Sequence, residues 1–351
     1  MASNHQREDL IFLINNYFEI HQIDDKSFVG KLREPWEINL RNLKMALESY
    51  GFIPFFSKKK NLHILTLAGK IYKEEKKESY WVNLILFLLT LLTTLLVGSF
   101  HQGGNPFLRI SDIFLGIPFS FSLLAILGSH ELGHYFIAKK EKVSVTLPYF
   151  LPVPHPLIGT MGAFIKMRSV VPSKKSLIRV GIAGPLTGFL VALPITYFGL
   201  KLSKIARLEE IRYGLSLGNS LIFSTLTKIV FKDLPQGVDI VLHPMAFAGW
   251  LGFFVTALNL IPLGQLDGGH IAYAIFGRFK IFIIAVLGVL IYLSKYWMGW
   301  LFWVIIVSLL SLKHPPVQDE ITPLTKKDIF LAILAFVILL LTFPPKPFGG
   351  I

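Results

Sequence analysis

Long apolar runs separated by short polar or basic segments dominate the sequence from residue 80 onward. The first run, Val82 to Phe100, is interrupted only by an asparagine and a few hydroxyl residues. A helix of about 20 such residues crosses the roughly 30 Å hydrocarbon core of a bilayer. Similar runs cover 113–138, 180–200, 247–263, 281–312 and 329–343. Because Ser294-Lys295 divides the 281–312 run into a hairpin, the pattern predicts a polytopic α-helical membrane protein with about six or seven transmembrane helices.

Two segments between these runs have a different pattern. Residues 143–172 are rich in proline, glycine and β-branched residues, so we expect a membrane-associated β-hairpin or a re-entrant segment there. The unpaired edge of a strand in this segment could pair with the backbone of a substrate, although packing in the protein core explains the composition equally well. The stretch from Gly214 to Phe231 is apolar but contains several polar residues, which is typical of a span, a re-entrant segment or an interfacial helix.

Residues 1–79 have the composition of a small soluble α+β domain. Between residues 38 and 51, Leu40, Leu43, Leu47 and Tyr50 fall on one helical face, and Gly51 is placed to end the helix. Strands are expected at 52–56 and 62–68, around a lysine-rich turn. The charged stretch 70–78 then predicts the domain boundary. The remaining domains are a transmembrane domain at 80–346 and a tail at 347–351.

Composition and charge support a membrane protein and narrow its chemistry. Charged residues make up 16% of the 351 residues, well below the roughly 25% of soluble domains. The net charge of +13 fits basic loops that flank membrane spans, so we do not expect a nucleic-acid partner. There is no cysteine, which excludes disulfides, thiolate metal sites and a cysteine nucleophile. Any metal must therefore be bound by histidine, aspartate or glutamate.

The second apolar run contains the pentapeptide His130-Glu-Leu-Gly-His134. On an α-helix, residues i and i+4 lie on one face, so both histidines can bind a single metal ion. Glu131 is rotated by about 100° from His130 and can instead reach a metal-bound water. Each ionisable residue inside a span costs about 2.5 kcal/mol or more unless it is paired or functional. Zinc-dependent amide hydrolysis is therefore favoured over a chance match.

A catalytic zinc usually has a third protein ligand and one open position. The segment Asn259-Leu-Ile-Pro-Leu-Gly-Gln-Leu-Asp267-Gly-Gly-His270 breaks a helix around a single carboxylate. Asp267 is a good candidate ligand in this segment, and His270 is a rival, because imidazole also binds zinc. Taken alone, Asp267-Gly-Gly is better explained as a surface turn that begins the next helix.

Taken together, HELGH, GIAGPLTG and NLIPLGQLDGG resemble the site-2 protease family of intramembrane zinc metalloproteases (peptidase M50). The resemblance covers residues 112–280 and is strongest to the EGY-like subgroup. It implies one Zn²⁺ ion bound by His130, His134 and Asp267, with Glu131 as the general base. It also places the family's conserved asparagine at Asn259, where the amide could bind a substrate carbonyl or oxyanion, or could cap the broken helix.

The resemblance implies a membrane-embedded zinc metalloendopeptidase that cleaves transmembrane protein substrates in the lipid bilayer. The alternative is a non-proteolytic membrane protein, such as a metal transporter or an inactive relative that binds partners. A polar N-terminus without a signal-peptide core predicts a cytoplasmic N-terminus, in a bacterial inner membrane. If Asp267 and the histidines form one site, residues 201–246 must begin and end on the outer side of the membrane. The basic residues at 201–212 do not favour that side. No feature of the sequence indicates the oligomeric state.

Overall fold

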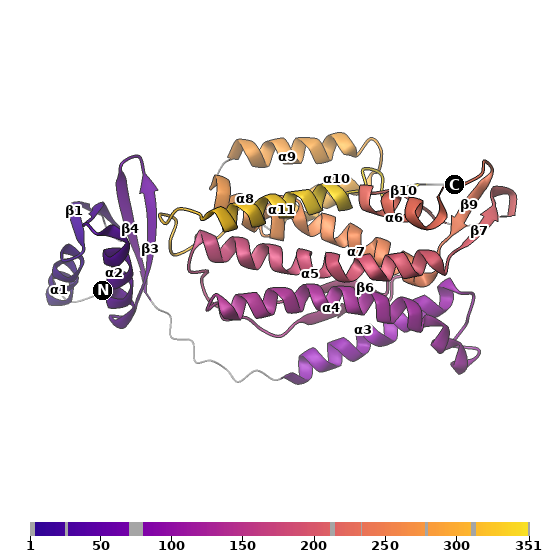
Figure 1. Cartoon of the computed structure of the whole chain (residues 1–351). Coiled ribbons are helices and arrows are strands. Elements are labelled where there is room, and N and C mark those ends of the chain that lie inside the picture. The colour runs from indigo at the N-terminus through magenta and orange to yellow at the C-terminus, as the bar shows by residue number, and fades with distance from the viewer. Residues whose placement is uncertain are drawn as a thin grey trace. The chain divides into compact units, whose positions relative to one another are not determined.

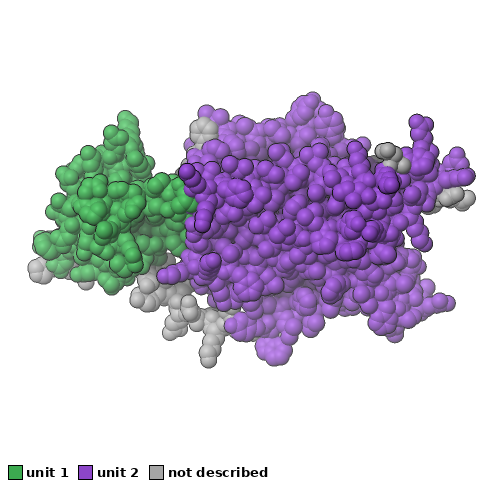
Figure 2. All heavy atoms as spheres, in the orientation of Figure 1, with its two compact units in different colours: residues 1–78, 170–177, 315–325 green, residues 79–169, 178–314, 326–351 purple. Residues whose placement is uncertain are grey.

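A computed structural model of the chain describes residues 4–24, 27–69, 80–210, 215–232, 234–277, 280–309 and 314–349. These residues form two compact units, coloured separately in Figure 2. The first unit contains residues 1–78 together with the segments 170–177 and 315–325. The second contains 79–169, 178–314 and 326–351. The predicted linker at 70–78 lies outside the described residues.

The first unit is built on a four-stranded antiparallel sheet and two helices. Its elements are α1 (Asn4–Asn15), β1 (Phe18–Ile23), β2 (Ser27–Leu32), α2 (Trp36–Ser49), β3 (Phe52–Lys59) and β4 (Leu62–Gly69). The strand order is β1-β2-β4-β3. The sequence pattern predicts α2, β3 and β4 but does not predict α1, β1 or β2.

The buried face of α2 explains this domain's core. Leu40, Leu43 and Leu47 pack with residues of α1 and the sheet, because they recur at helical spacing. Tyr50 was expected on the same face, but the helix ends at Ser49 and Tyr50 is exposed. Gly51 follows with a φ of +81°, a conformation that glycine adopts without strain.

Helices dominate the second unit (Figure 1). In chain order they are α3 (Tyr80–His101), η1 (Ile110–Gly116), α4 (Ile117–Lys140), α5 (Lys174–Lys201), η2 (Leu208–Glu210), α6 (Leu221–Phe231), α7 (Pro244–Leu260), α8 (Asp267–Phe276), α9 (Lys280–Leu293), α10 (Gly299–Leu309) and α11 (Lys326–Thr342). The first four residues of α5 belong to the first unit.

Short strand pairs join the helices. The hairpin of β5 (Tyr149–Pro152) and β6 (Thr160–Phe164) forms in the 143–172 segment, so the expected extended structure is present. Two further pairs are β7 (Lys204–Arg207) with β9 (Val238–Val241), and β8 (Ser216–Leu217) with β10 (Phe348–Gly349). Figure 1 shows β7 and β9 at the end of the second unit.

Three helical segments of the described chain are long and apolar enough to cross a membrane: Tyr80–His101, Ile110–Lys140 and Lys174–Lys201. These match the first three predicted spans and indicate an integral membrane protein. The later predicted spans correspond to shorter helices, α7 and α9 to α11, and α9 and α10 form the expected hairpin. The total of six or seven spans therefore remains a prediction. Gly214 lies outside the described residues, and α6 has only 11 residues.

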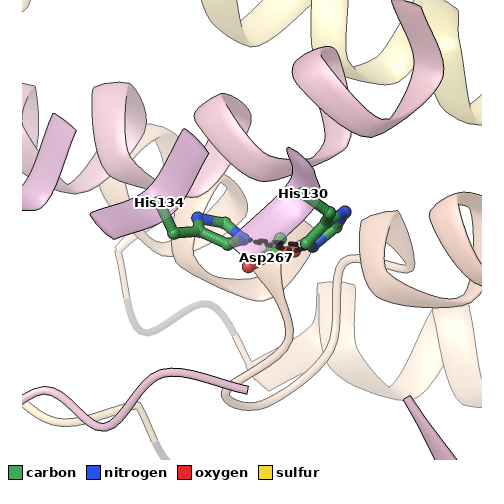
Figure 3. A group of neighbouring side chains, drawn as sticks. All are labelled: His130, His134 and Asp267. Atoms are coloured by element: carbon green, nitrogen blue, oxygen red, sulfur yellow. Dashed lines mark hydrogen bonds and ion pairs between the residues drawn. The ribbon is translucent and has the colours of Figure 1, made fainter. Parts of the chain in front are cut away.

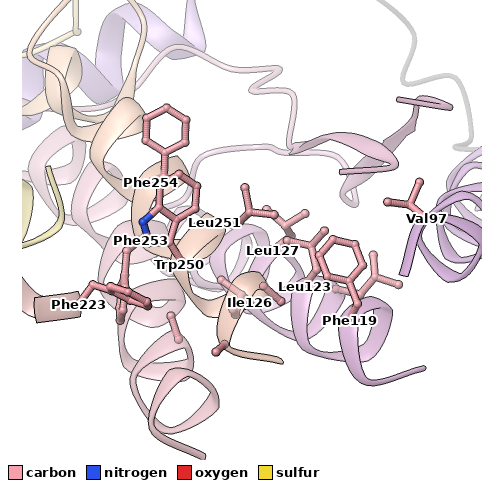
Figure 4. Close-up of a cluster of buried hydrophobic side chains, with 14 of the residues drawn as sticks. Val97, Phe119, Leu123, Ile126, Leu127, Phe223, Trp250, Leu251, Phe253 and Phe254 are labelled. Atoms are coloured by element: carbon pink, nitrogen blue, oxygen red, sulfur yellow. The ribbon is translucent and has the colours of Figure 1, made fainter. Parts of the chain in front are cut away.

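The core of the second unit lies between α4 and α7. Helices α4 and α7 are in contact, and Leu123, Ile126 and Leu127 of α4 belong to the same buried cluster as Trp250 and Phe253 of α7 (Figure 4). Glycines allow α5 to pack closely against both helices. A Cβ on Gly133 of α4 would overlap the hydroxyl of Thr187 in α5, and one on Gly249 of α7 would overlap the hydroxyl of Thr196 in α5. Helices α4, α5 and α7 therefore form one closely packed group.

Candidate metal centre

The two histidines lie on the buried face of α4. His130 and His134 are one helical turn apart, and their exposed fractions are 5% and 6%. Gly133, between them, has no room for a side chain because the backbone of Ala183 in α5 lies against it. The i, i+4 spacing and the close approach of α5 together direct both imidazoles into the space between helices α4, α5 and α7.

Asp267 reaches the same space because the chain breaks between α7 and α8. Helix α7 ends at Leu260, and Asp267 is the first residue of α8. The six intervening residues fold back tightly, so that a Cβ on Gly268 or Gly269 would collide with the carbonyls of Leu260 and Leu263. The glycines that follow Asp267 are therefore required by the tight turn that directs the carboxylate toward α4.

The three predicted ligand atoms converge on one point (Figure 3). The distance between the two histidine Nε2 atoms is 3.1 Å, and Asp267 Oδ2 lies 3.3 Å from that of His130 and 3.2 Å from that of His134. Ligands bound about 2.1 Å from a tetrahedral zinc ion are separated by about 3.4 Å. The donor set and its spacing therefore fit zinc. No other group of three such residues within ligand distance occurs in the described chain.

A backbone carbonyl supports one ligand from behind, and a side-chain amide lies beside the ligand atom of another. The Nδ1 atom of His134 lies 2.8 Å from the carbonyl oxygen of Val180 in α5. A proton on Nδ1 leaves Nε2 free as a metal ligand, which is the usual support for such a histidine. The Nδ2 atom of Asn259, at the end of α7, lies 3.3 Å from Nε2 of His130. Asn259 therefore borders the ligand cluster directly.

Glu131 is buried beside the ligands but belongs to a different part of the α4 surface. Its exposed fraction is 6%, and its carboxylate is hydrogen-bonded to the backbone of Ile165, the residue that follows β6. The hairpin therefore contacts the predicted general base. A carboxylate next to a metal centre, and not among its ligands, can accept a proton from water.

The rival ligand, His270, has a different partner. Its Nδ1 atom lies 2.6 Å from Nε2 of His314, whose ring stacks on Tyr273 with a centroid distance of 4.2 Å. The ligand group of His130, His134 and Asp267 does not include it. The geometry therefore agrees with the choice of Asp267 that the family resemblance implied.

Comparison with known proteins identifies the family. The model of peptidase family M50 matches residues 118–293, half of the chain. The chain belongs to peptidase family M50. It is 31% identical to "Probable zinc metalloprotease EGY2, chloroplastic" of Arabidopsis thaliana over 246 residues, which is 67% of this chain and 42% of that protein. The resemblance to the site-2 protease family and its EGY-like subgroup is thus confirmed.

Two further relatives extend the match. The protein named "Probable zinc metalloprotease EGY1, chloroplastic" of Oryza sativa subsp. japonica is 29% identical over 58% of this chain and 39% of its own length. "Probable zinc metalloprotease EGY3, chloroplastic" of Oryza sativa subsp. indica is 30% identical over 92% of this chain and 60% of its own length. The chain spans about two fifths of the length of the first relatives that it matches. No solved structure matches the chain.

Several residues that support the ligands are not predicted by the sequence pattern. Gly184 and Gly188 both face the ligands: a Cβ on Gly184 would overlap the His134 ring, and one on Gly188 would come within 3.3 Å of His130 Nδ1. Their regular spacing with Gly181 is the sequence feature that could have predicted this role. No sequence feature predicts the role of Val180, because every residue has a backbone carbonyl.

One ion-pair network joins three helices of the second unit next to the carbonyl of Val180. Arg179 donates from Nε to Asp328 of α11 and from a terminal nitrogen to Glu141, which caps α4, at 3.0 Å each. Asp328 is fully buried, so its charge needs this partner. Arg179 therefore holds the start of α5 against α4 and α11, one residue before the carbonyl that contacts His134.

Proposed function

We propose that the chain is an intramembrane zinc metalloprotease that hydrolyses peptide bonds in or near transmembrane segments of other membrane proteins. The observation that carries this function is the convergence of His130, His134 and Asp267 on one point, with Glu131 buried beside them. Family membership supports the same chemistry. Two of these ligands lie on a helix of membrane-spanning length and composition, which favours substrates that are themselves in the membrane.

The roles of the residues follow from their positions. His130, His134 and Asp267 would hold one zinc ion, which when bound polarises the scissile carbonyl and makes water more acidic. Glu131 accepts the proton of the attacking water and delivers it to the leaving amine. Asn259 points its amide at the edge of the ligand cluster, where Nδ2 can donate to the substrate carbonyl oxygen as negative charge develops on it.

Replacing Glu131 with Gln tests this function directly. The amide keeps the shape of the side chain but cannot accept the proton, so we expect peptide cleavage to fall at least about 10²-fold. Zinc content should stay at the wild-type level, because Glu131 is not a ligand. The measurements are cleavage of a single-span substrate in proteoliposomes and bound zinc in the same samples.

The outcomes separate this function from its alternatives. Retained cleavage by the Glu131→Gln variant would contradict the assigned base. Zinc flux across the liposome membrane without cleavage of any membrane substrate would instead favour a transporter. The membrane substrates that remain uncut in cells carrying Glu131→Gln would identify the natural partners.

We also propose an orientation in which the N-terminal domain and the end of α4 lie on the cytoplasmic side of a bacterial inner membrane. The support is the positive-inside tendency: residues 139–179 contain eight lysines and arginines. Lys139 and Lys140 end α4, about one turn after His134. The metal centre is then closest to the cytoplasmic face.

A further inference from the structure

The sheet of the N-terminal domain does not end at β3. On the side of β3 that β4 leaves free, Phe56 donates its N–H to Gln318 at 2.7 Å and accepts from Glu320 at 2.9 Å. Phe56 and Asp319 form a parallel bridge. Residues 318–320, which lie shortly before α11, therefore add a short strand to the open edge of this sheet.

A second segment continues the same sheet outward. Gln318 donates to the carbonyl of Val171 at 3.0 Å, and Lys174 donates to that of Asp319 at 3.3 Å. Ser173 and Asp319 form another parallel bridge. The edge of the N-terminal sheet thus holds, in order, the 315–325 segment and the 170–177 segment, which are about 145 residues apart in the sequence.

Side chains anchor the 315–325 segment to the domain. Ile321 packs against the domain's core cluster, and Val317 is buried. The Asp319 carboxylate accepts the N–H groups of Ile321 and Thr322, both at 2.9 Å, and so stabilises the turn that carries Ile321. The segment is therefore bound by an apolar contact as well as by backbone pairing.

Both segments run directly into supports of the metal centre. Lys174 begins α5, and six residues later the carbonyl of Val180 contacts His134. Four residues before Gln318, His314 contacts His270, which lies on α8 one turn after Asp267. Short strand pairs with few hydrogen bonds open more readily than a helix core does, so they suit a regulatory role.

We propose that the N-terminal domain regulates the metal centre by strand addition, holding the 170–177 and 315–325 segments together so that α5 and α8 keep the ligands in place. The proposal rests on the proposed function in taking this centre to be the catalytic zinc site. Its interaction surface is the β3 edge, and its partner is the chain's own 315–325 segment. Release of that segment loosens zinc binding and slows cleavage.

The test uses the full-length, zinc-loaded protein in detergent and three variants. Ile321→Asp removes the apolar anchor, and Gln318→Pro removes the hydrogen bond to Val171 while leaving the domain core intact. Pro323→Asp adds the same charge at an exposed position and is the matched control. Hydrogen exchange, zinc release to a chelator and substrate cleavage are measured on the same preparations.

We expect hydrogen exchange of the Lys174 amide, which donates to Asp319, to become at least about tenfold faster in both disrupting variants. Zinc release should also become about tenfold faster, the lower end of the effect of removing a ligand's supporting contact. The Pro323→Asp control should match the wild type. If Ile321→Asp unfolds the N-terminal domain, the Gln318→Pro variant decides the test, because it alters only the link between the two segments.

The proposal is overturned if residues 318–320 exchange freely while zinc release stays at the wild-type rate. Its failure is distinct from failure of the proposed function. Faster zinc release, with no cleavage even by the wild type, would support the regulatory link and reject the protease. Normal cleavage and zinc retention in both variants would reject the link and leave the protease standing.

Discussion

At the residue scale, the metal centre requires two glycines as well as the side chains that bind the metal. Gly184 of α5 faces His134, and a Cβ there would overlap the imidazole ring. Gly188, one turn later, faces His130 with slightly more room. The histidine pair can therefore occupy the space between α4 and α5 only because α5 offers small residues at these two positions.

This difference predicts a graded effect of alanine. Gly184→Ala should weaken zinc binding about 10- to 100-fold, because the new methyl group displaces His134 from the position shared with Asp267. Gly188→Ala should weaken it no more than about threefold, since its nearest contact is 3.2 Å. Gly288→Ala is the matched control, with nothing within 4 Å of the added atom. Competition with a fluorescent zinc chelator measures the affinities; equal effects at 184 and 188 would contradict the steric argument.

At the element scale, the β5–β6 hairpin is held between α3 and the metal centre. Asn83 of α3 donates to the carbonyls of Leu147 and Pro148, at 3.1 and 2.9 Å. Phe150 of β5 packs edge-to-face on Phe87 with a centroid distance of 5.2 Å. In the described chain, β6 pairs only with β5. Its other edge is therefore available for pairing with an unwound substrate segment, close to Glu131.

Strand addition at this edge is testable by proline substitution at positions 161, 163 and 164; Gly162 is left unchanged, because its φ of +94° suits neither proline nor alanine. Proline removes an N–H that faces β5 at alternate positions and one that faces the free edge at the others. We expect the free-edge positions to lose cleavage about tenfold or more while zinc binding and thermal stability are kept. Alanine at positions 161 and 164 keeps the N–H and serves as the control, and residue 163 is alanine in the wild type. If every folded proline variant cleaves normally, substrates do not pair with β6.

At the scale of the whole molecule, the orientation in the membrane follows from where basic residues gather. The chain has no cysteine, so a single introduced thiol reports its own location. We expect a membrane-impermeant maleimide to label Lys204→Cys in intact cells and to label Lys58→Cys and Lys140→Cys only after permeabilisation. All three positions are exposed. Labelling of Lys140→Cys in intact cells would reverse the proposed orientation.

The fold is predictable from sequence wherever a single local pattern decides it. The apolar runs located α3, α4 and α5 because length and hydropathy are enough to identify a long membrane helix. The elements α1, β1 and β2 were missed because their patterns are short and weakly periodic. The pairing of 318–320 with β3 has no local signal, since it joins residues more than 250 positions apart.

The sequence by itself determined the chemistry of the site: a histidine pair one turn apart, a glutamate between them and a carboxylate at a broken helix. These are predictable because helical spacing and helix breaking are local properties of the chain. Only the tertiary structure decided that Asp267 meets the pair while His270 turns to His314. It also decided that glycines of α5 make the necessary space, because the separation of packed helices depends on residues distant in sequence.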